Sequence, residues 1–224
     1  YFFRELSSEH LLIGADGASS KVARKAGFPR HPVAIGMQAE TKIKPCSRNS
    51  YAVFFGKSHG FYSYIVPFNN TAKAGMIGQG DISRQFDNFL NFLGTNPSNR
   101  SSALIPIPGL MKINKGHIWL LGDAACHVKA SGGGIVPSIK AAAAVTEVIA
   151  RKNYSMLRQL NKELFLQSLV RKAISKFNDK DFDKLLCLIE KQKLQLGSRD
   201  ELRGWLFRLL LKNPSLLNFV RKLF

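Results

Sequence analysis

Residues 116–149, GHIWLLGDAACHVKASGGGIVPSIKAAAAVTEVI, carry the pattern that decides the fold. Residues 117–121 form a short apolar run typical of a β-strand, and Gly122 with Asp123 ends it. A loop that ends in three glycines, residues 132–134, leads into a helix rich in alanine. The pattern predicts a strand, a loop and a helix, with a carboxylate at the carboxyl end of the strand, where α/β sheets bind ligands.

The residue types around this turn are those that a polar, electron-rich ligand requires. The triple glycine leaves backbone N–H groups free to approach such a ligand at the positive end of the helix. A side chain added at Gly133 or Gly134 is expected to block that approach. Asp123 is suited to accept a hydrogen bond from a sugar-like hydroxyl. A triple glycine alone more often only packs a helix on a strand, but Gly-Asp-Ala-Ala followed by Gly-Gly-Gly-Ile is much more specific.

This pair of patterns resembles the second flavin-binding motif of FAD-dependent oxidoreductases of the para-hydroxybenzoate hydroxylase type, and within them the geranylgeranyl reductase family. The resemblance implies that Asp123 contacts the ribityl chain of FAD and that the backbone of Gly134 and Ile135 faces the pyrimidine side of the isoalloxazine. Two features depart from the family: Cys126 stands where Gly is usual, and the loop before the triple glycine is one residue shorter and lacks a proline. In this motif the resemblance assigns to the cofactor Gly122, Asp123, Gly132, Gly133, Gly134 and Ile135.

A second motif precedes the first by about a hundred residues. Asp16 and Gly17 follow an apolar strand-like run and allow a tight turn, and Ser19 or Ser20 can cap the helix that follows. With Arg24 at its spacing, the segment resembles the DG motif of the same flavoproteins. The resemblance implies that Asp16 and Gly17 bind FAD near its pyrophosphate.

The region between the two motifs predicts an antiparallel sheet. Alternating apolar and polar or small residues are separated by turn formers in residues 33–43, 51–56, 61–68 and 72–80. A helix is expected over residues 84–93, and the proline-rich residues 105–109 are expected to be extended and to lead back to the flavin domain.

Within that sheet, GFYSYIVP at residues 60–67 resembles the substrate-domain signature Tyr-x-Trp-x-Phe-Pro of the family. The resemblance implies that Tyr62, Tyr64 and Pro67 contact an isoprenoid lipid substrate, and apolar walls suit such a chain because they leave no polar group unpaired. The alternative is that the aromatic side chains are ordinary strand residues.

Beyond residue 150 the pattern becomes helical. Helices are predicted over residues 157–177, 181–193, 200–211 and 215–224, the second with Asp179 or Asp181 as its cap. The predicted fold class is α/β (α+β): a partial Rossmann-like FAD-binding domain (1–30 and 105–152), an inserted antiparallel-sheet substrate domain (31–104) and a C-terminal helical region (153–224).

Composition bounds the class of protein. The chain has 224 residues, 45% hydrophobic, with a formal charge of +18. No apolar run reaches the roughly 18 residues of a membrane span and no signal-peptide pattern is present, so a cytoplasmic protein is expected. Three widely spaced cysteines predict no disulfide framework and no metal site. The charge admits three interpretations: a nucleic-acid partner, an anionic membrane surface, or a proteome that is basic throughout. No nucleic-acid motif accompanies it, and an anionic membrane surface is retained as a possible partner. Residues 151–224 hold 17 Lys or Arg against 7 Asp or Glu.

The resemblance implies a FAD-dependent oxidoreductase that reduces double bonds of geranylgeranyl-type isoprenoids, as in archaeal-type ether-lipid precursors. A flavin monooxygenase or halogenase-like enzyme, or a non-catalytic flavoprotein subunit, are the alternatives. No catalytic acid is assigned; His127 lies near the motif, where a structural role is commoner. The sequence lacks the Gly-x-Gly-x-x-Gly unit that binds the FAD pyrophosphate in this group. We therefore expect an incomplete enzyme, or one that a separate N-terminal FAD-binding chain completes.

Overall fold

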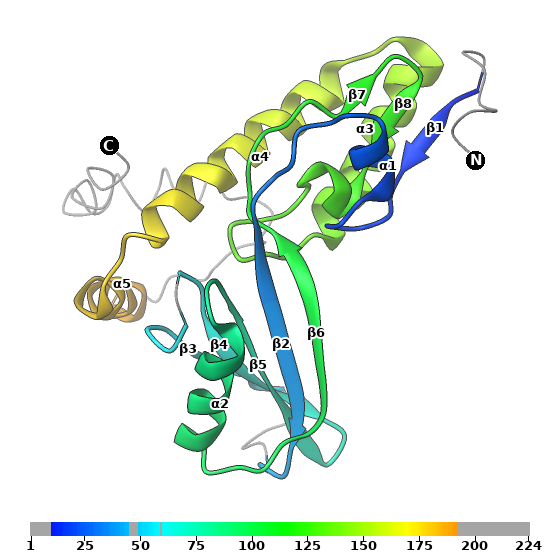
Figure 1. The fold of residues 1–224 in the computed structure, drawn as a ribbon. Helices are drawn as coiled ribbons and strands as arrows, with labels where there is room; N and C mark the ends of the chain where they lie inside the picture. Colours follow the sequence, from blue (N-terminus) through cyan, green and yellow to red (C-terminus); the bar gives the residue numbers. More distant parts are fainter. Residues whose placement is uncertain (1–9, 45–48, 59, 192–224) are drawn as a thin grey trace. The chain divides into compact units, whose positions relative to one another are not determined.

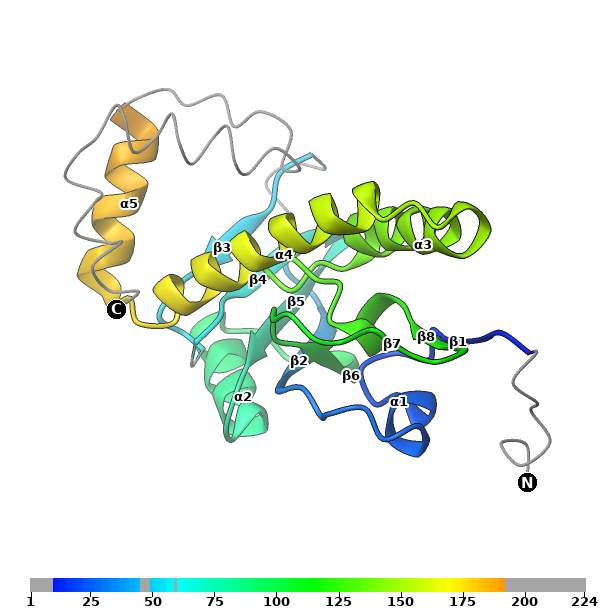
Figure 2. The same ribbon diagram turned by 90° about the horizontal axis from the view of Figure 1, so that it is seen from above.

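The computed structural model describes residues 10–44, 49–58 and 60–191. These residues fall into two compact units, the first made of residues 10–33 and 105–171 and the second of residues 34–104 and 172–191. Figures 1 and 2 show the elements of each unit in two views. In the part of the chain that the structure describes, no helix is long and apolar enough to cross a membrane.

The first unit is built on a small sheet in which the two motifs lie on neighbouring strands (Figure 1). Its order is β1 (Leu12–Gly14), β8 (Ile118–Leu120), β7 (Asn114–Lys115). β1 and β8 are parallel, with Leu12 opposite Ile118 and Gly14 opposite Leu120, whereas β7 and β8 are antiparallel. The strands predicted over residues 11–15 and 117–121 are therefore confirmed, and they are adjacent.

Three helices complete the first unit: α1 (Lys21–Lys25), α3 (Ile135–Arg151) and α4 (Ser155–Ile174), the last turn of α4 passing into the second unit. In Figure 2, α1 and α3 lie on opposite sides of the sheet. Small residues of α3, such as Ala141 and Ala144, are fully buried and allow the helix to approach the sheet closely. The apolar core that joins these elements includes Phe28, Trp119, Leu120, Val145, Val148, Leu157, Leu160 and Leu164.

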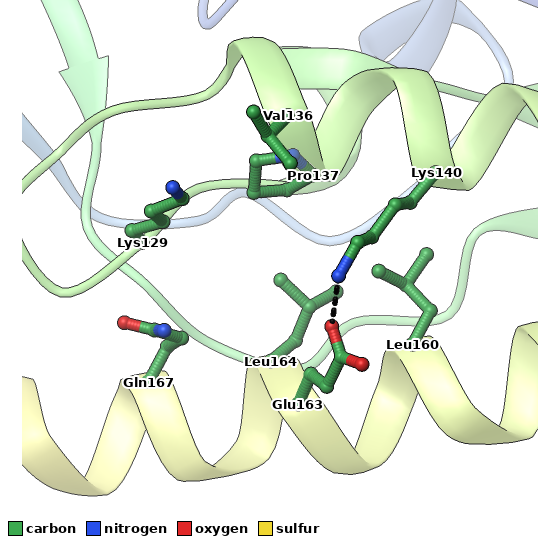
Figure 3. A pocket seen from close by; sticks show the side chains of 8 residues that line it. All are labelled: Lys129, Val136, Pro137, Lys140, Leu160, Glu163, Leu164 and Gln167. Atoms are coloured by element: carbon green, nitrogen blue, oxygen red, sulfur yellow. Dashed lines mark hydrogen bonds and ion pairs between the residues drawn. The ribbon is translucent and has the colours of Figure 1, made fainter. Parts of the chain in front are cut away.

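α3 and α4 pack side by side around a shallow pocket (Figure 3). Lys140 of α3 forms an ion pair with Glu163 of α4 at 3.0 Å. Gln167 of α4 accepts a hydrogen bond from the backbone N–H of Ala130 at 2.8 Å. Because Ala130 belongs to the loop before the triple glycine, α4 holds that loop as well as covering the core.

The second unit is a five-stranded sheet of order β3 (Ala52–Phe54), β4 (Ser63–Phe68), β5 (Thr71–Gly78), β2 (Val33–Thr41), β6 (Ser98–Pro106). The β3–β4, β4–β5 and β5–β2 pairs are antiparallel, as predicted. α2 (Ile82–Phe92) packs on one face through four buried apolar residues, Ile82, Phe86, Phe89 and Leu90. Asp81 begins this helix by accepting a hydrogen bond from the N–H of Arg84.

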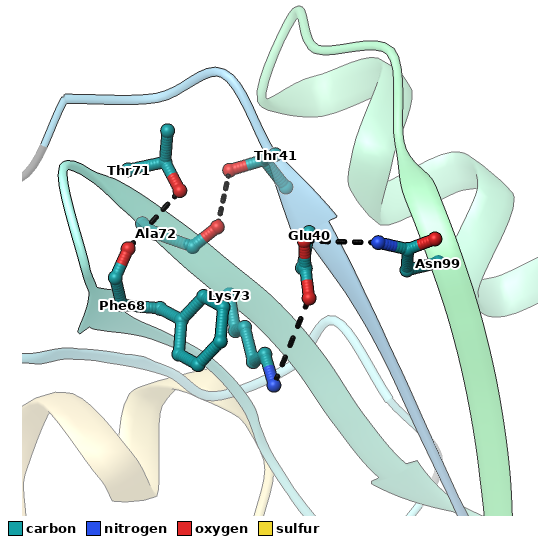
Figure 4. A network of polar contacts seen from close by, with 7 residues as sticks. All are labelled: Glu40, Thr41, Phe68, Thr71, Ala72, Lys73 and Asn99. Atoms are coloured by element: carbon teal, nitrogen blue, oxygen red, sulfur yellow. Dashed lines mark hydrogen bonds and ion pairs between the residues drawn. The ribbon is translucent and has the colours of Figure 1, made fainter.

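Polar contacts fasten one end of this sheet (Figure 4). Glu40 on β2 lies 4.0 Å from the ammonium group of Lys73 on β5 and accepts a hydrogen bond from Asn99 on β6. The Thr41 hydroxyl donates to the carbonyl of Ala72 at 2.9 Å. Three neighbouring strands are thus tied together by side chains in addition to their backbone ladders.

The structure corrects three predictions. β6 covers residues 98–104, of which 98–102 are polar and for which no strand was predicted. The cap of α5 (Asp179–Lys191) is Asn178, whose amide oxygen accepts from the N–H of Asp181 while the Asp181 carboxylate accepts from the N–H of Asn178. The predicted helical block 153–224 is divided, because α4 belongs mainly to the first unit and α5 to the second. The helices predicted over residues 200–211 and 215–224 lie outside the described residues.

Candidate active site

The first unit brings its two predicted motifs to the same edge of one sheet. β1 ends at Gly14 and β8 ends at Leu120, which is the register partner of Gly14. Asp16 and Asp123 therefore both follow the carboxyl ends of neighbouring parallel strands. This is the edge at which open α/β sheets bind ligands.

The carboxylate of Asp16 is hydrogen-bonded to the start of the helix that follows it, α1. It accepts hydrogen bonds from the Ser20 hydroxyl, from the N–H of Lys21 at 2.7 Å and from the N–H of Val22 at 3.2 Å. Of the two predicted caps, Ser19 and Ser20, it is Ser20 that is the N-cap of α1, and its side chain accepts from the N–H of Ala23. Burial alone would raise the pKa of Asp16, but these hydrogen bonds hold it below its usual value.

Gly17 completes this turn with a φ of +84°, and a Cβ built there meets no atom within 4 Å. The positive φ, which L side chains rarely adopt, is thus the structural reason for glycine. In this structure Asp16 and Gly17 shape the turn between β1 and α1, and their contact with FAD stays a prediction.

Asp123 is placed differently. It lies in the first turn of the short 3₁₀ helix η2 (Gly122–Ala125), half-buried, with no hydrogen bond to its carboxylate among the described residues. Burial raises the pKa of Asp123, and nearby His31 acts in the opposite direction. A partly desolvated carboxylate without a protein donor is available to accept a hydrogen bond from a ligand.

The triple glycine forms the start of α3. Gly134 is the N-cap of the helix and no side chain caps it. The first-turn N–H groups of Ile135 and Val136 have no intrahelical acceptor, and Pro137 at the next position has no N–H. α3 therefore presents two backbone donors and the positive end of its dipole without a protein partner among the described residues.

Each glycine of the triplet has a different reason. Gly132 has a φ of +89°. A Cβ on Gly134 would stand 2.8 Å from the Oδ1 atom of Asp123 and 3.3 Å from Val128, whereas a Cβ on Gly133 would meet only the Ser131 hydroxyl at 3.9 Å. From the sequence we expected a side chain at either Gly133 or Gly134 to block the approach of a ligand. Within the protein, only Gly134 is tightly packed, and it is packed against Asp123.

Cys126 and His127 follow η2 and are both buried. Cys126 has a φ of +56° and a ψ of +30°, which is the left-handed conformation that favours glycine. Gly, which the resemblance leads us to expect at this position, adopts this conformation without a steric penalty. Burial, with a contribution from Asp123, raises the pKa of the Cys126 thiol to about 12, so the thiol is neutral and unreactive.

His127 is 1% exposed, and neither ring nitrogen has a hydrogen-bond partner among the described residues. Burial lowers the pKa of His127 to about 4. The imidazole is therefore neutral at physiological pH and is not suited to donate a proton as an acid.

The three predicted substrate residues lie on or beside β4 of the second unit. Tyr62 and Tyr64 are two residues apart and their ring centroids are 6.2 Å apart. Tyr64 stands opposite Gly75 on β5, and a Cβ at Gly75 would overlap the Tyr64 ring. The glycine thus makes room for the ring to lie over the sheet, and burial raises the pKa of Tyr64. Pro67 is paired with Ala72.

Sequence reasoning missed two residues of the first unit that act on this site. His31 lies near Asp123 and Gln167 anchors Ala130. Neither belongs to a motif, and Gln167 is 37 positions from the residue that it holds. No local signal in the sequence could have found them.

The residues present fit the ring and ribityl parts of a flavin. An accepting carboxylate stands beside uncapped backbone donors, and the absence of a side chain at Gly134 keeps the two close together. A ribityl hydroxyl can donate to Asp123, and a carbonyl on the pyrimidine side of the ring can accept from the N–H groups at the start of α3.

Comparisons with known proteins identify relatives of the chain. No protein-family model matches the chain. Digeranylgeranylglycerophospholipid reductase 1 of Methanothermobacter thermautotrophicus is 25% identical over 96% of this chain and 61% of its own length. Digeranylgeranylglycerophospholipid reductase 3 of Methanosphaera stadtmanae is 27% identical over 75% and 48%. An uncharacterised protein of Methanocaldococcus jannaschii is 25% identical over 82% and 54%. The chain thus spans about half to three fifths of the length of these relatives.

Solved structures show the same fold. A geranylgeranyl bacteriochlorophyll reductase-like protein of Thermoplasma acidophilum superposes with a TM-score of 0.73, at 17% identity, over 96% of this chain and 62% of that protein. The flavin-dependent halogenase CmlS superposes with a TM-score of 0.52, at 13% identity, over 83% and 42%. The chain has the mixed α/β fold of the FAD-binding flavoproteins. Two of the relatives carry the name digeranylgeranylglycerophospholipid reductase, which agrees with the resemblance to the geranylgeranyl reductase family.

Proposed function

We propose that this chain is the part of a FAD-dependent oxidoreductase that holds the isoalloxazine and ribityl end of the cofactor, and that the enzyme reduces geranylgeranyl-type double bonds of archaeal-type ether-lipid precursors. The observation that carries the flavin assignment is the Asp123 carboxylate, which accepts no hydrogen bond from the described residues, beside the start of α3, which no side chain caps. The names of two relatives support the substrate class.

In this proposal the residues of the chain bind and orient the cofactor and the substrate. Asp123 fixes the ribityl chain, and the N–H groups of Ile135 and Val136 stabilise negative charge on the pyrimidine side of the ring. Reduced FAD, when bound, supplies the hydride that adds to one alkene carbon, and a proton adds to the other. Neutral His127 and the Cys126 thiol, held protonated by its raised pKa, are not suited to give that proton, so water is the proposed source.

The substrate is proposed to lie along the aromatic side chains of Tyr62 and Tyr64, whose rings offer an apolar wall. An anionic membrane surface is the proposed location, because the lipid substrate resides there and the chain carries a charge of +18. Co-sedimentation with anionic vesicles at low and high salt tests the membrane proposal. Equal pelleting with neutral vesicles would contradict it.

Two measurements test the function. Riboflavin should bind to the chain, because it contains both parts of the cofactor that the site contacts. A loss of riboflavin fluorescence during titration with the chain would report this binding. With dithionite as electron source, a digeranylgeranyl phospholipid should gain H₂ for each reduced bond, as mass spectrometry can show. An oxygenated or halogenated product, formed with O₂, would favour a monooxygenase or halogenase instead. Absence of riboflavin binding would leave a non-catalytic subunit.

A further inference from the structure

The loop before the triple glycine contains a turn that needs a hydrogen-bond acceptor from outside itself. The carbonyl of Lys129 accepts from the N–H of Gly132 at 2.8 Å, and the N–H of Lys129 donates to the carbonyl of Gly133 at 2.9 Å. Ala130 is the second residue of this turn, and the N–H of that residue takes no part in the bonding of a β-turn. Because Ala130 is only 9% exposed, its N–H requires an acceptor from elsewhere in the protein.

Gln167 of α4 supplies that acceptor. Its amide oxygen lies 2.8 Å from the nitrogen of Ala130, and its NH₂ group donates to no described residue. Figure 3 shows Gln167 pointing from α4 toward the loop that carries Lys129. On the preceding turns of α4, Leu160 and Leu164 are buried in the core of the first unit. The hydrogen bond therefore ties the loop to a helix whose own position is set by apolar packing.

The composition of the loop makes such a tie important. Residues 126–134 contain three consecutive glycines and no proline. Glycine loses more conformational freedom on ordering than any other residue, so a loop of this kind is held in one conformation only by its contacts. The hydrogen bond between Lys129 and Gly133 closes the turn, so that a displacement of Ala130 also displaces Gly133.

The next residue, Gly134, is where the loop meets the proposed flavin site. A Cβ built on Gly134 would lie 2.8 Å from Oδ1 of Asp123 and 3.3 Å from Val128. At such close range, a shift of the loop changes the separation of the Asp123 carboxylate from the backbone donors at the start of α3. Gln167 thus acts on this separation through the loop and without contact with Asp123.

We propose that Gln167 is a positioning residue of the flavin site: by accepting a hydrogen bond from Ala130, it holds the loop so that the start of α3 stays beside the Asp123 carboxylate. The inference rests on the proposed function, because the ligand is the flavin of that site. It adds a residue of α4, outside both motifs, to the residues on which flavin binding depends.

Three variants separate the hydrogen bond from the packing of α4. Gln167→Leu removes the acceptor and keeps a similar volume, whereas Gln167→Glu keeps an oxygen in the same place. Glu163→Gln is the matched control, one turn earlier on the same helix. It weakens the 3.0 Å ion pair between Glu163 and Lys140 of α3, and removes no bond to the loop.

The first readout is the affinity of each folded variant for riboflavin. We expect Gln167→Leu to bind riboflavin about tenfold more weakly, which corresponds to the loss of one hydrogen bond. Gln167→Glu and Glu163→Gln should bind it as the wild type does. An equal loss in Gln167→Leu and Glu163→Gln would overturn the proposal, because the packing of α4 and not the bond to the loop would then matter.

The second readout needs no flavin. Cys126 belongs to the same loop and is 1% exposed, so iodoacetamide should alkylate it slowly in the folded wild type. In Gln167→Leu the alkylation of Cys126, located by mass spectrometry, should be about tenfold faster, and in the other two variants it should be unchanged. The exposed Cys187 of α5 is the internal reference. The same rate at Cys126 in Gln167→Leu and in the wild type would contradict the hold on the loop.

The two proposals fail separately. A wild type that binds no riboflavin refutes the proposed function, whereas faster alkylation of Cys126 in Gln167→Leu would still support the hold of Gln167 on the loop. Riboflavin binding that Gln167→Leu leaves unchanged, with Cys126 protected as in the wild type, refutes only the positioning role.

Discussion

The two strand-to-helix turns of the first unit look alike in sequence and differ in what their aspartates do. Asp16 follows β1 and Asp123 follows β8, at the same edge of one sheet. The Asp16 carboxylate accepts three hydrogen bonds from the start of α1, whereas the Asp123 carboxylate accepts none within the described residues, and the start of α3 has no side-chain cap. We call the first turn closed, because its carboxylate is hydrogen-bonded to its own helix. We call the second turn open, because its carboxylate accepts no hydrogen bond from the described residues and can accept one from a ligand.

Gly134→Val should have the largest effect, because it closes the open turn. Its branched side chain would displace the Asp123 carboxylate, which stands 2.8 Å from an added Cβ. We expect no measurable riboflavin binding while the helical circular-dichroism signal is retained. Gly133→Val is the matched control, because an added Cβ there meets only Ser131 at 3.9 Å and does not displace the Asp123 carboxylate. Full flavin affinity in Gly134→Val would show that the turn is only a connector.

His127 should make the open turn sensitive to acid. Its pKa is about 4 in the folded chain and about 6.5 when unfolded, so the unfolded state binds the proton first. Stability should be unaffected above pH 6.5 and should fall as the pH drops from 6.5 to 4, by about 3 kcal/mol in total. Urea unfolding of the wild type and of His127→Gln across this range isolates the effect. Parallel pH curves for the two proteins would contradict it.

Asp16→Ala should destabilise the closed turn, by about 1–2 kcal/mol, because it removes the acceptor of three hydrogen bonds at the start of α1. Asp123→Ala should leave stability nearly unchanged, because it breaks no such bond. Thermal unfolding of the two variants compares the turns directly. A larger loss of stability in Asp123→Ala would reverse their assignment.

Cys126 offers the smallest effect. Its φ of +56° is costly for any residue with a Cβ. Cys126→Gly and Cys126→Ala both remove the thiol, but only the glycine relieves the backbone. We expect the glycine variant to be more stable than the alanine variant by about 1 kcal/mol in chemical unfolding. Greater stability of the alanine variant would mean that the left-handed conformation carries no strain.

Local patterns predicted the elements that carry the site. The apolar run before Gly122 and the small residues after Gly134 were sufficient to predict β8 and α3, because burial on a sheet and a tight approach have simple signatures. The cap at Ser20 was predicted for a similar reason, since Ser, Thr, Asp and Asn are the residues that cap helices. Local patterns thus predicted two strand-to-helix turns, each with a Gly and an Asp, whereas their placement in one domain came from the family resemblance.

Features set by distant parts of the chain could not be predicted. The polar residues 98–102 begin β6 because they pair with the backbone of β2, which no periodicity in that segment reveals. Which of the two aspartate carboxylates accepts hydrogen bonds from the protein depends on the orientation of each side chain and not on its motif. The hold of Gln167 on Ala130 joins residues 37 positions apart. Such contacts arise from tertiary packing, which local patterns do not encode.

The most direct test of the account measures the preference for riboflavin over lumiflavin, which has the same ring system without the ribityl chain. If Asp123 accepts a ribityl hydrogen bond, the wild type should prefer riboflavin by about 1–3 kcal/mol, or roughly 5- to 150-fold. Asp123→Ala should bind the two flavins equally, and Asp16→Ala should keep the preference of the wild type. A preference that survives in Asp123→Ala, or that disappears in folded Asp16→Ala, would contradict the assignment of the open and closed turns.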